Sequence, residues 1–102
     1  NNANYHGHNY VMYAHVTGPI DQETGYVIDL GKLKQIINEE VTSRYDHKNL
    51  NLDCDDFKTL NPTAENIVVV IWNRIRKRLE KHLDLTITLY ETERNCVEYS
   101  GE

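Results

Sequence analysis

Residues 85–99 read Leu-Thr-Ile-Thr-Leu-Tyr-Glu-Thr-Glu-Arg-Asn-Cys-Val-Glu-Tyr. A leucine or isoleucine stands at every second position from 85 to 89, which is the two-residue period of a strand with one buried face. The polar residues 93–95 then indicate a turn, and a second strand is expected over residues 96–99. This stretch therefore predicts an antiparallel hairpin. Its apolar face must pack against other parts of the chain.

Another strand and a first helix are expected before the hairpin. Residues 9–16 are rich in β-forming residues and stop before Thr17-Gly18-Pro19, which indicates a strand followed by a loop. Asp29 is a suitable N-cap for a helix, because its carboxylate can accept from the free amides of the first turn. Apolar residues then follow at spacings of three and four, and this helix should end near Arg44 or Tyr45.

A second helix is expected after a long loop over residues 46–61. Thr63, directly after Pro62, is its predicted N-cap, and its apolar positions continue to a predicted end near His82. Loops as long as this one in a compact domain are often functional. The order of strand, two helices and hairpin predicts a single α+β domain over residues 1–102, with an antiparallel sheet backed by the two helices.

Charge and composition exclude several classes of protein. The chain has 16 acidic and 11 basic residues and a net charge of −5, which disfavours nucleic acid as a partner. No apolar run approaches the roughly 20 residues of a membrane span, so no membrane association is expected. The only cysteines, Cys54 and Cys96, stand far apart and suggest neither a disulfide framework nor a metal clip. A cytoplasmic protein is predicted.

His6-Gly7-His8 is the strongest local signal for a metal site. Residues two apart in an extended segment point to the same side, so both imidazoles can reach one ion. Zinc is the natural candidate, although a catalytic zinc has three protein ligands and the pair supplies only two. Taken alone, the pair is weak evidence, because two such histidines are more often ordinary surface or hydrogen-bonded residues than metal ligands.

Other residue groups suit acid–base chemistry and the binding of a polar ring. Asp46 beside His47 can fix a tautomer for proton transfer, or can simply cap a loop. Thr63 and Glu65, at the start of the second helix, can hold a polar heterocycle or only begin the helix. Glu91 ends a strand, where its carboxylate can accept two parallel hydrogen bonds from a guanidine-like edge or face water.

Together, five motifs resemble those of the 6-pyruvoyltetrahydropterin synthase family, and the resemblance extends over essentially the whole chain. They are Asn-Asn-Ala-Asn-Tyr-His-Gly-His-Asn-Tyr at 1–10, Gly-Tyr-Val-Ile-Asp-Leu at 25–30, Asp-His-Lys-Asn-Leu at 46–50, Pro-Thr-Ala-Glu-Asn at 62–66 and Tyr-Glu-Thr at 90–92. The resemblance implies the tunnelling fold, in which each subunit has a four-stranded antiparallel sheet backed by two helices. It also implies a homo-oligomer, in which three subunits close a barrel and two trimers stack as a hexamer.

The resemblance implies a zinc-dependent lyase whose small-molecule substrate is 7,8-dihydroneopterin triphosphate. The reaction eliminates triphosphate and needs no redox cofactor. The roles are carried over by position: zinc ligands His6 and His8, catalytic residues Asp46, His47 and Glu91, and substrate-binding residues Thr63, Glu65 and Glu91.

Two departures from the family pattern concern the start of the sequence. The family's third zinc histidine and reactive cysteine lie upstream of Asn1, and neither Cys54 nor Cys96 stands at that cysteine's position. We therefore expect a domain that lacks its first strand because the sequence is trimmed.

Three alternatives to this pterin synthase remain at the level of sequence. The closest is a 6-carboxytetrahydropterin synthase of queuosine and deazapurine biosynthesis, although the Asn-Asn-Ala-Asn run before Tyr5 favours the pyruvoyl branch. The second is a non-catalytic pterin-binding subunit, and the third is an unrelated α+β interaction module.

Overall fold

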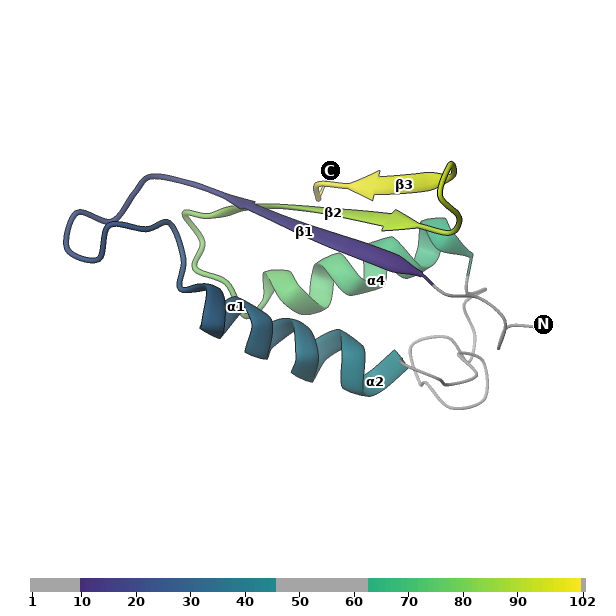
Figure 1. The fold of residues 1–102 in the computed structure, drawn as a ribbon, viewed down its shortest axis with the longest axis horizontal. Helices are drawn as coiled ribbons and strands as arrows, with labels where there is room; N and C mark the ends of the chain where they lie inside the picture. Colours follow the sequence, from purple (N-terminus) through teal and green to yellow (C-terminus); the bar gives the residue numbers. More distant parts are fainter. Residues whose placement is uncertain (1–9, 46–62, 102) are drawn as a thin grey trace.

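The computed structural model describes residues 10–45 and 63–101, and Figure 1 shows them as one sheet covered by helices. The strands are β1 (Val11–Thr17), β2 (Asp84–Tyr90) and β3 (Cys96–Tyr99). All neighbours are antiparallel, in the order β1-β2-β3. The predicted hairpin is confirmed, and the predicted strand over 9–16 is found shifted by one or two residues.

The register places one apolar row of β2 against the helices. Val11 pairs with Tyr90 and Thr17 pairs with Asp84, while Ile87 pairs with Tyr99 on the other side. Leu85, Ile87 and Leu89 are buried, as the alternation of the sequence predicts. The opposite face of the sheet carries the more exposed positions, with Val11 51% and Tyr13 53% exposed.

The first helical run has three parts: α1 (Leu30–Ile37), the π-helix η2 (Asn38–Thr42) and the short α2 (Ser43–Tyr45). The predicted N-cap is confirmed, because the Asp29 carboxylate accepts from the backbone N–H of Gly31 over 2.9 Å. The run continues to Tyr45, after which the next residues lie outside the described part of the chain, so the predicted end near Arg44 or Tyr45 stays a prediction. The change to π-helical bonding in η2 was not predicted.

The second helix, α4 (Ala64–Arg76), also begins at its predicted cap. The Thr63 hydroxyl accepts from the backbone N–H of Asn66 over 3.2 Å. The predicted end near His82 is wrong, because α4 stops at Arg76 and turns follow it. The Arg76 guanidinium donates to the backbone carbonyls of Glu80 and Leu83, and these bonds hold the chain in turns where a continued helix would carry it away from the sheet.

The core lies between the sheet and the helices, which cover one face of it (Figure 1). Ile36 of α1, Ile75 of α4 and Ile87 of β2 are almost completely buried in it. Trp72 joins α4 to the sheet, because its indole Nε1 donates to the carbonyl oxygen of Leu85 over 2.8 Å and its ring meets Tyr99 edge-on. Among the described helices, none has the length and apolar character needed to cross a membrane.

Candidate functional site

Glu91 stands at the end of β2, where the sequence predicts the acid that holds a polar ring. Its backbone N–H donates to the carbonyl oxygen of Asn95 over 2.9 Å, so the chain begins to turn toward β3 at this residue. The Glu91 side chain is exposed. Because Leu89 faces the helices, the alternation of the strand assigns Glu91 to that same side of the sheet, beyond the last buried residue.

Tyr10 is the neighbour of Glu91 and a residue that the sequence reasoning did not assign to the site. It directly precedes β1, one position beyond the Val11–Tyr90 pair, and it packs partly buried against the core. Burial and, second, the negative charge of Glu91 raise the pKa of Tyr10. The phenol therefore keeps its proton near the carboxylate. The signal that could have found it is the two-residue period, which places Tyr10 on the same face as Met12.

Thr63 and Glu65 lie at the beginning of α4, and Figure 1 shows this end of α4 at the same end of the molecule as the end of β2. Both side chains are exposed. The Thr63 oxygen accepts the Asn66 amide, so its hydroxyl hydrogen is left to donate outward. Glu65 occupies the first turn, where the helix dipole favours an acid. The structure thus brings three predicted residues, Thr63, Glu65 and Glu91, to one end of the fold.

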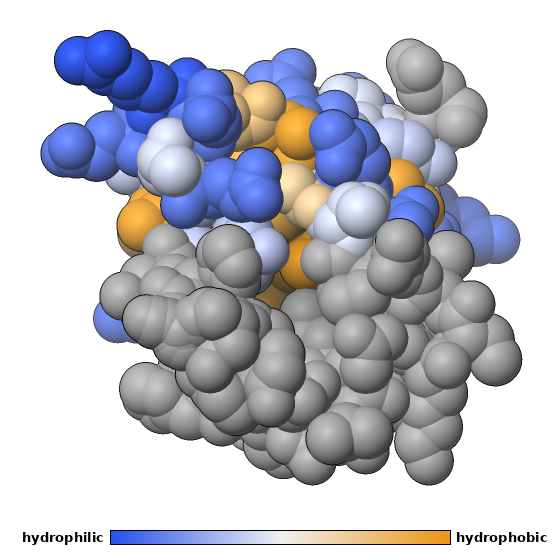
Figure 2. All heavy atoms as spheres, turned by 90° about the vertical axis from the view of Figure 1, so that its right-hand side faces the viewer, coloured by the Kyte–Doolittle hydropathy of each residue, from blue (hydrophilic) through white to orange (hydrophobic). Residues whose placement is uncertain are grey.

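The remaining predicted site residues, His6, His8, Asp46 and His47, lie outside the described residues. Within residues 10–45 and 63–101, no group of three or more His, Cys, Asp or Glu side chains could hold a metal ion. Figure 2 views the molecule from the end that carries Glu91. On the coloured part of that surface, hydrophobic side chains show between hydrophilic ones.

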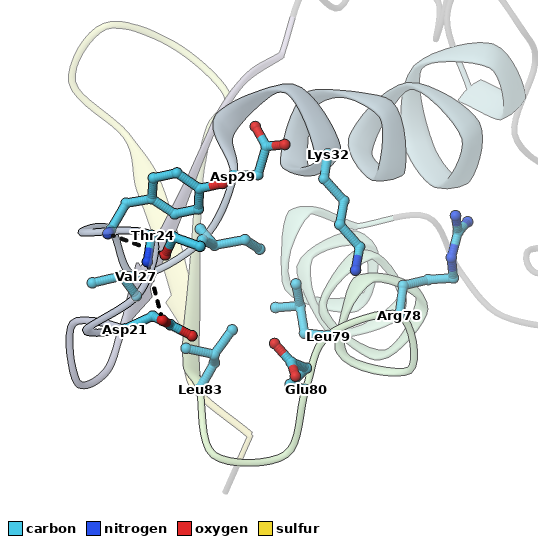
Figure 3. A pocket seen from close by; sticks show the side chains of 11 residues that line it. Asp21, Thr24, Val27, Asp29, Lys32, Arg78, Leu79, Glu80 and Leu83 are labelled. Atoms are coloured by element: carbon cyan, nitrogen blue, oxygen red, sulfur yellow. Dashed lines mark hydrogen bonds between the residues drawn. The ribbon is translucent and has the colours of Figure 1, made fainter.

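A separate hollow of about 200 Å³ lies elsewhere, between the loop before α1, the start of α1 and the turns after α4 (Figure 3). Its lining contains none of the predicted site residues. Asp29 and Lys32 from the α1 side and Leu83 from the far side contribute to it. Because β2 runs from Asp84 to Tyr90, Leu83 and Glu91 flank opposite ends of that strand, and the hollow is therefore distinct from the candidate site.

Comparison with known proteins identifies the family. The model of the family described as 6-pyruvoyl tetrahydropterin synthase matches residues 1–102. A solved structure of Caenorhabditis elegans 6-pyruvoyl tetrahydropterin synthase superposes with a TM-score of 0.84 at 32% identity, covering 93% of this chain and 68% of that chain.

Two curated relatives have the same level of similarity. The Drosophila melanogaster protein named 6-pyruvoyl tetrahydrobiopterin synthase is 41% identical over 102 residues, which is 99% of this chain and 61% of the relative. The human protein of the same name is 41% identical over 102 residues, covering 100% of this chain and 70% of the relative. The chain thus spans between 61% and 70% of these two proteins. It belongs to the 6-pyruvoyl tetrahydropterin synthase family of enzymes.

Proposed function

We propose that the whole protein is a 6-pyruvoyltetrahydropterin synthase, a lyase that eliminates triphosphate from 7,8-dihydroneopterin triphosphate. The observation that carries this proposal is the position of Glu91. Its exposed carboxylate stands beyond the last buried residue of β2, next to Tyr10 and at the same end of the fold as the start of α4. Family membership supports the same reaction.

Glu91 recognises the pterin ring in this proposal. A pterin presents two adjacent N–H groups along one edge, and a carboxylate can accept both in parallel. Thr63 and Glu65 then line the pocket from the start of α4, with the Thr63 hydroxyl as a donor. Holding the ring in this way contributes to catalysis by fixing the reacting side chain of the substrate.

Zinc binding and proton transfer are assigned to residues of the matching motifs. The chemistry of the donor set fits zinc, because His6 and His8 offer two imidazole nitrogens at alternate positions. When bound, zinc supplies a Lewis acid that makes neighbouring C–H protons of the substrate more acidic. His47 moves protons to and from the substrate side chain, and Asp46 orients the His47 imidazole.

The proposed assembly is a homo-hexamer of two barrel-forming trimers in the cytoplasm. Among the described strands, β3 at one edge of the sheet pairs on one side only, and an unpaired strand edge favours pairing with another chain. Val11 and Tyr13, each about half exposed, add apolar surface on the face turned away from the helices. Light scattering of the purified whole protein tests the hexamer, and cell fractionation tests the cytoplasmic location.

Two substitutions in the whole protein test the assignment of roles. His6→Ala should lose zinc and activity together, as measured by elemental analysis and by the release of triphosphate. Glu91→Gln should retain zinc and raise KM roughly 10- to 100-fold, because hydrogen bonds to a charged acceptor are lost. Mass spectrometry of the product distinguishes a pyruvoyl pterin from a carboxy pterin formed with acetaldehyde.

Control substitutions of the same residue types are available. His15, exposed on β1, and Glu93, exposed in the turn after β2, should tolerate His15→Ala and Glu93→Gln with normal zinc content and activity. Full activity of metal-free protein would remove the zinc assignment. An unchanged KM in Glu91→Gln would remove Glu91 as the pterin anchor.

A further inference from the structure

The hollow beside α1 has a rim with internal hydrogen bonds and a floor of apolar side chains. Its rim is the loop over residues 21–28, which is closed by hydrogen bonds between the backbones of Asp21 and Tyr26 (3.1 Å) and of Gly25 and Asp21 (2.7 Å). The Asp21 carboxylate also accepts from the amides of Glu23 and Thr24 within the loop. Leu79 and Leu83, which are 7% and 1% exposed, form the floor. These hydrogen bonds within the loop hold its side chains beside the buried leucines.

Two opposite charges face this floor from different elements. Figure 3 shows the amino group of Lys32 reaching over the hollow from α1 and the carboxylate of Glu80 rising from the turn after α4, with Leu79 between them. Neither side chain makes an ion pair or hydrogen bond with another described residue. Both charges are thus available to a ligand.

The other charged groups of the lining are already engaged. Arg78 points away from the hollow in Figure 3, and its guanidinium contacts the carboxylates of Glu39 and Glu40 at 2.9 and 2.7 Å. Asp29 accepts the Gly31 amide at the start of α1. Among the charged groups of the lining, the Lys32 ammonium and the Glu80 carboxylate are thus the two without a partner in the described residues, while the carboxylates of Asp21 and Asp29 remain negative and accept backbone amides.

We propose that this hollow is a binding site for a free α-amino acid with an apolar side chain. The ligand carboxylate lies toward Lys32, its ammonium toward Glu80, and its side chain against the accessible apolar lining of Tyr26, Val27 and Ile28, above the buried Leu79 and Leu83. Each charged group of the ligand then lies near a side chain of opposite charge, and the apolar side chain of the ligand is removed from water. The site is separate from the Glu91 end of the fold and does not depend on the pterin assignment.

The size of the hollow and the exposure of its charges set the expected affinity. A volume of about 200 Å³ suits a ligand the size of one amino acid and is smaller than the pockets that hold drug-sized molecules. Lys32 and Glu80 are both solvent-exposed, and ion pairs at exposed positions are weak. We therefore expect a dissociation constant on the order of 1 mM, as for a metabolite present at high concentration.

Calorimetric titration of the whole protein with L-leucine and three analogues tests the site. Leucinamide lacks the carboxylate, N-acetyl-leucine lacks the ammonium, and glycine lacks the apolar side chain. Each should bind at least about 5-fold more weakly than leucine. Lys32→Met should abolish the preference for leucine over leucinamide, and Glu80→Gln should abolish the preference for leucine over N-acetyl-leucine.

Lys34→Met on the same helix and Glu93→Gln in the distant hairpin turn are the matched controls and should keep both preferences. Absence of heat with leucine up to about 20 mM would overturn the proposal. So would equal binding of all four compounds, or an equal loss of preference in Lys32→Met and Lys34→Met. Pterin turnover is measured on the same samples, so a failure of the amino-acid site is distinguishable from a failure of the proposed function.

Discussion

The guanidinium of Arg78 lies 2.9 Å from the carboxylate of Glu39 and links the turn after α4 to η2. A hydrogen bond from the Gln35 side chain first, and the one from Arg78 second, lower the pKa of Glu39. Glu39 is therefore easier to ionise in the folded protein than in the unfolded chain. A carboxyl with a lowered folded-state pKa stabilises the fold above its ordinary pKa and loses this effect as the pH falls.

We predict a pH-dependent difference between the wild-type protein and Glu39→Gln. The wild type should have the higher melting temperature near neutral pH, and the gap should narrow as the pH falls from about 5 to about 3. Thermal unfolding followed by circular dichroism measures it. Glu23→Gln, in an exposed loop without an ion pair to the described residues, is the control. A difference in melting temperature that stays constant over this pH range would show that the Glu39 charge does not contribute to the stability of the fold.

Trp72→Phe should destabilise the protein by about 1–3 kcal/mol, because the carbonyl of the buried Leu85 loses its indole donor. Urea unfolding measures the change. Tyr13→Phe, which alters an aromatic residue that is 53% exposed, should change the free energy of unfolding by less than about 0.5 kcal/mol. Equal effects of the two substitutions would mean that the Trp72 bond is unimportant.

Gly101→Ala should be more damaging than Gly25→Ala, although both glycines have a positive φ, +88° and +82° respectively. A methyl group on Gly101 would overlap Cζ2 of Trp72, whereas one on Gly25 would meet no atom within 4 Å. Gly25→Ala should therefore cost only the conformational strain of about 1–2 kcal/mol. Gly101→Ala should also shift the emission of Trp72, the only tryptophan, to longer wavelength. An unchanged emission spectrum would contradict the close contact.

Thr63→Ala should lower the free energy of unfolding by about 1 kcal/mol, because the Asn66 amide loses its capping acceptor. Thr63→Ser keeps the hydroxyl and should restore most of the stability. Denaturant titration measures both variants. A loss of stability in Thr63→Ser equal to that in Thr63→Ala would show that the methyl group, and not the cap, is responsible.

Local signals in the sequence predicted much of this fold. Asp29 and Thr63 each cap a helix through a hydrogen bond to an amide two or three residues away, so the sequence alone could place both helix starts. The end of α4 could not be placed in this way. Leu79 continues the apolar spacing of the helix, but the bond from Arg76 to the Leu83 carbonyl depends on the folded turn.

For a similar reason, only some residues of the candidate site could be predicted from the sequence. Glu91 was identifiable because it follows a strand with a clear two-residue period. Tyr10 was missed, because its importance depends on pairing between β1 and β2, whose partners are 67 to 79 positions apart in sequence. The roles of His6, His8, Asp46 and His47 stay predictions based on the resemblance.

The π-helix η2 has a consequence for how the chain length can vary. Its i→i+5 bonding accommodates an extra residue relative to an α-helix, which is what a one-residue insertion into a helix produces. Removing one residue between 38 and 42 can therefore restore regular helical bonding without breaking the run. If the residue removed is Glu39 or Glu40, Arg78 keeps one carboxylate partner in place of two, so homologues shortened at that point should lack this paired contact.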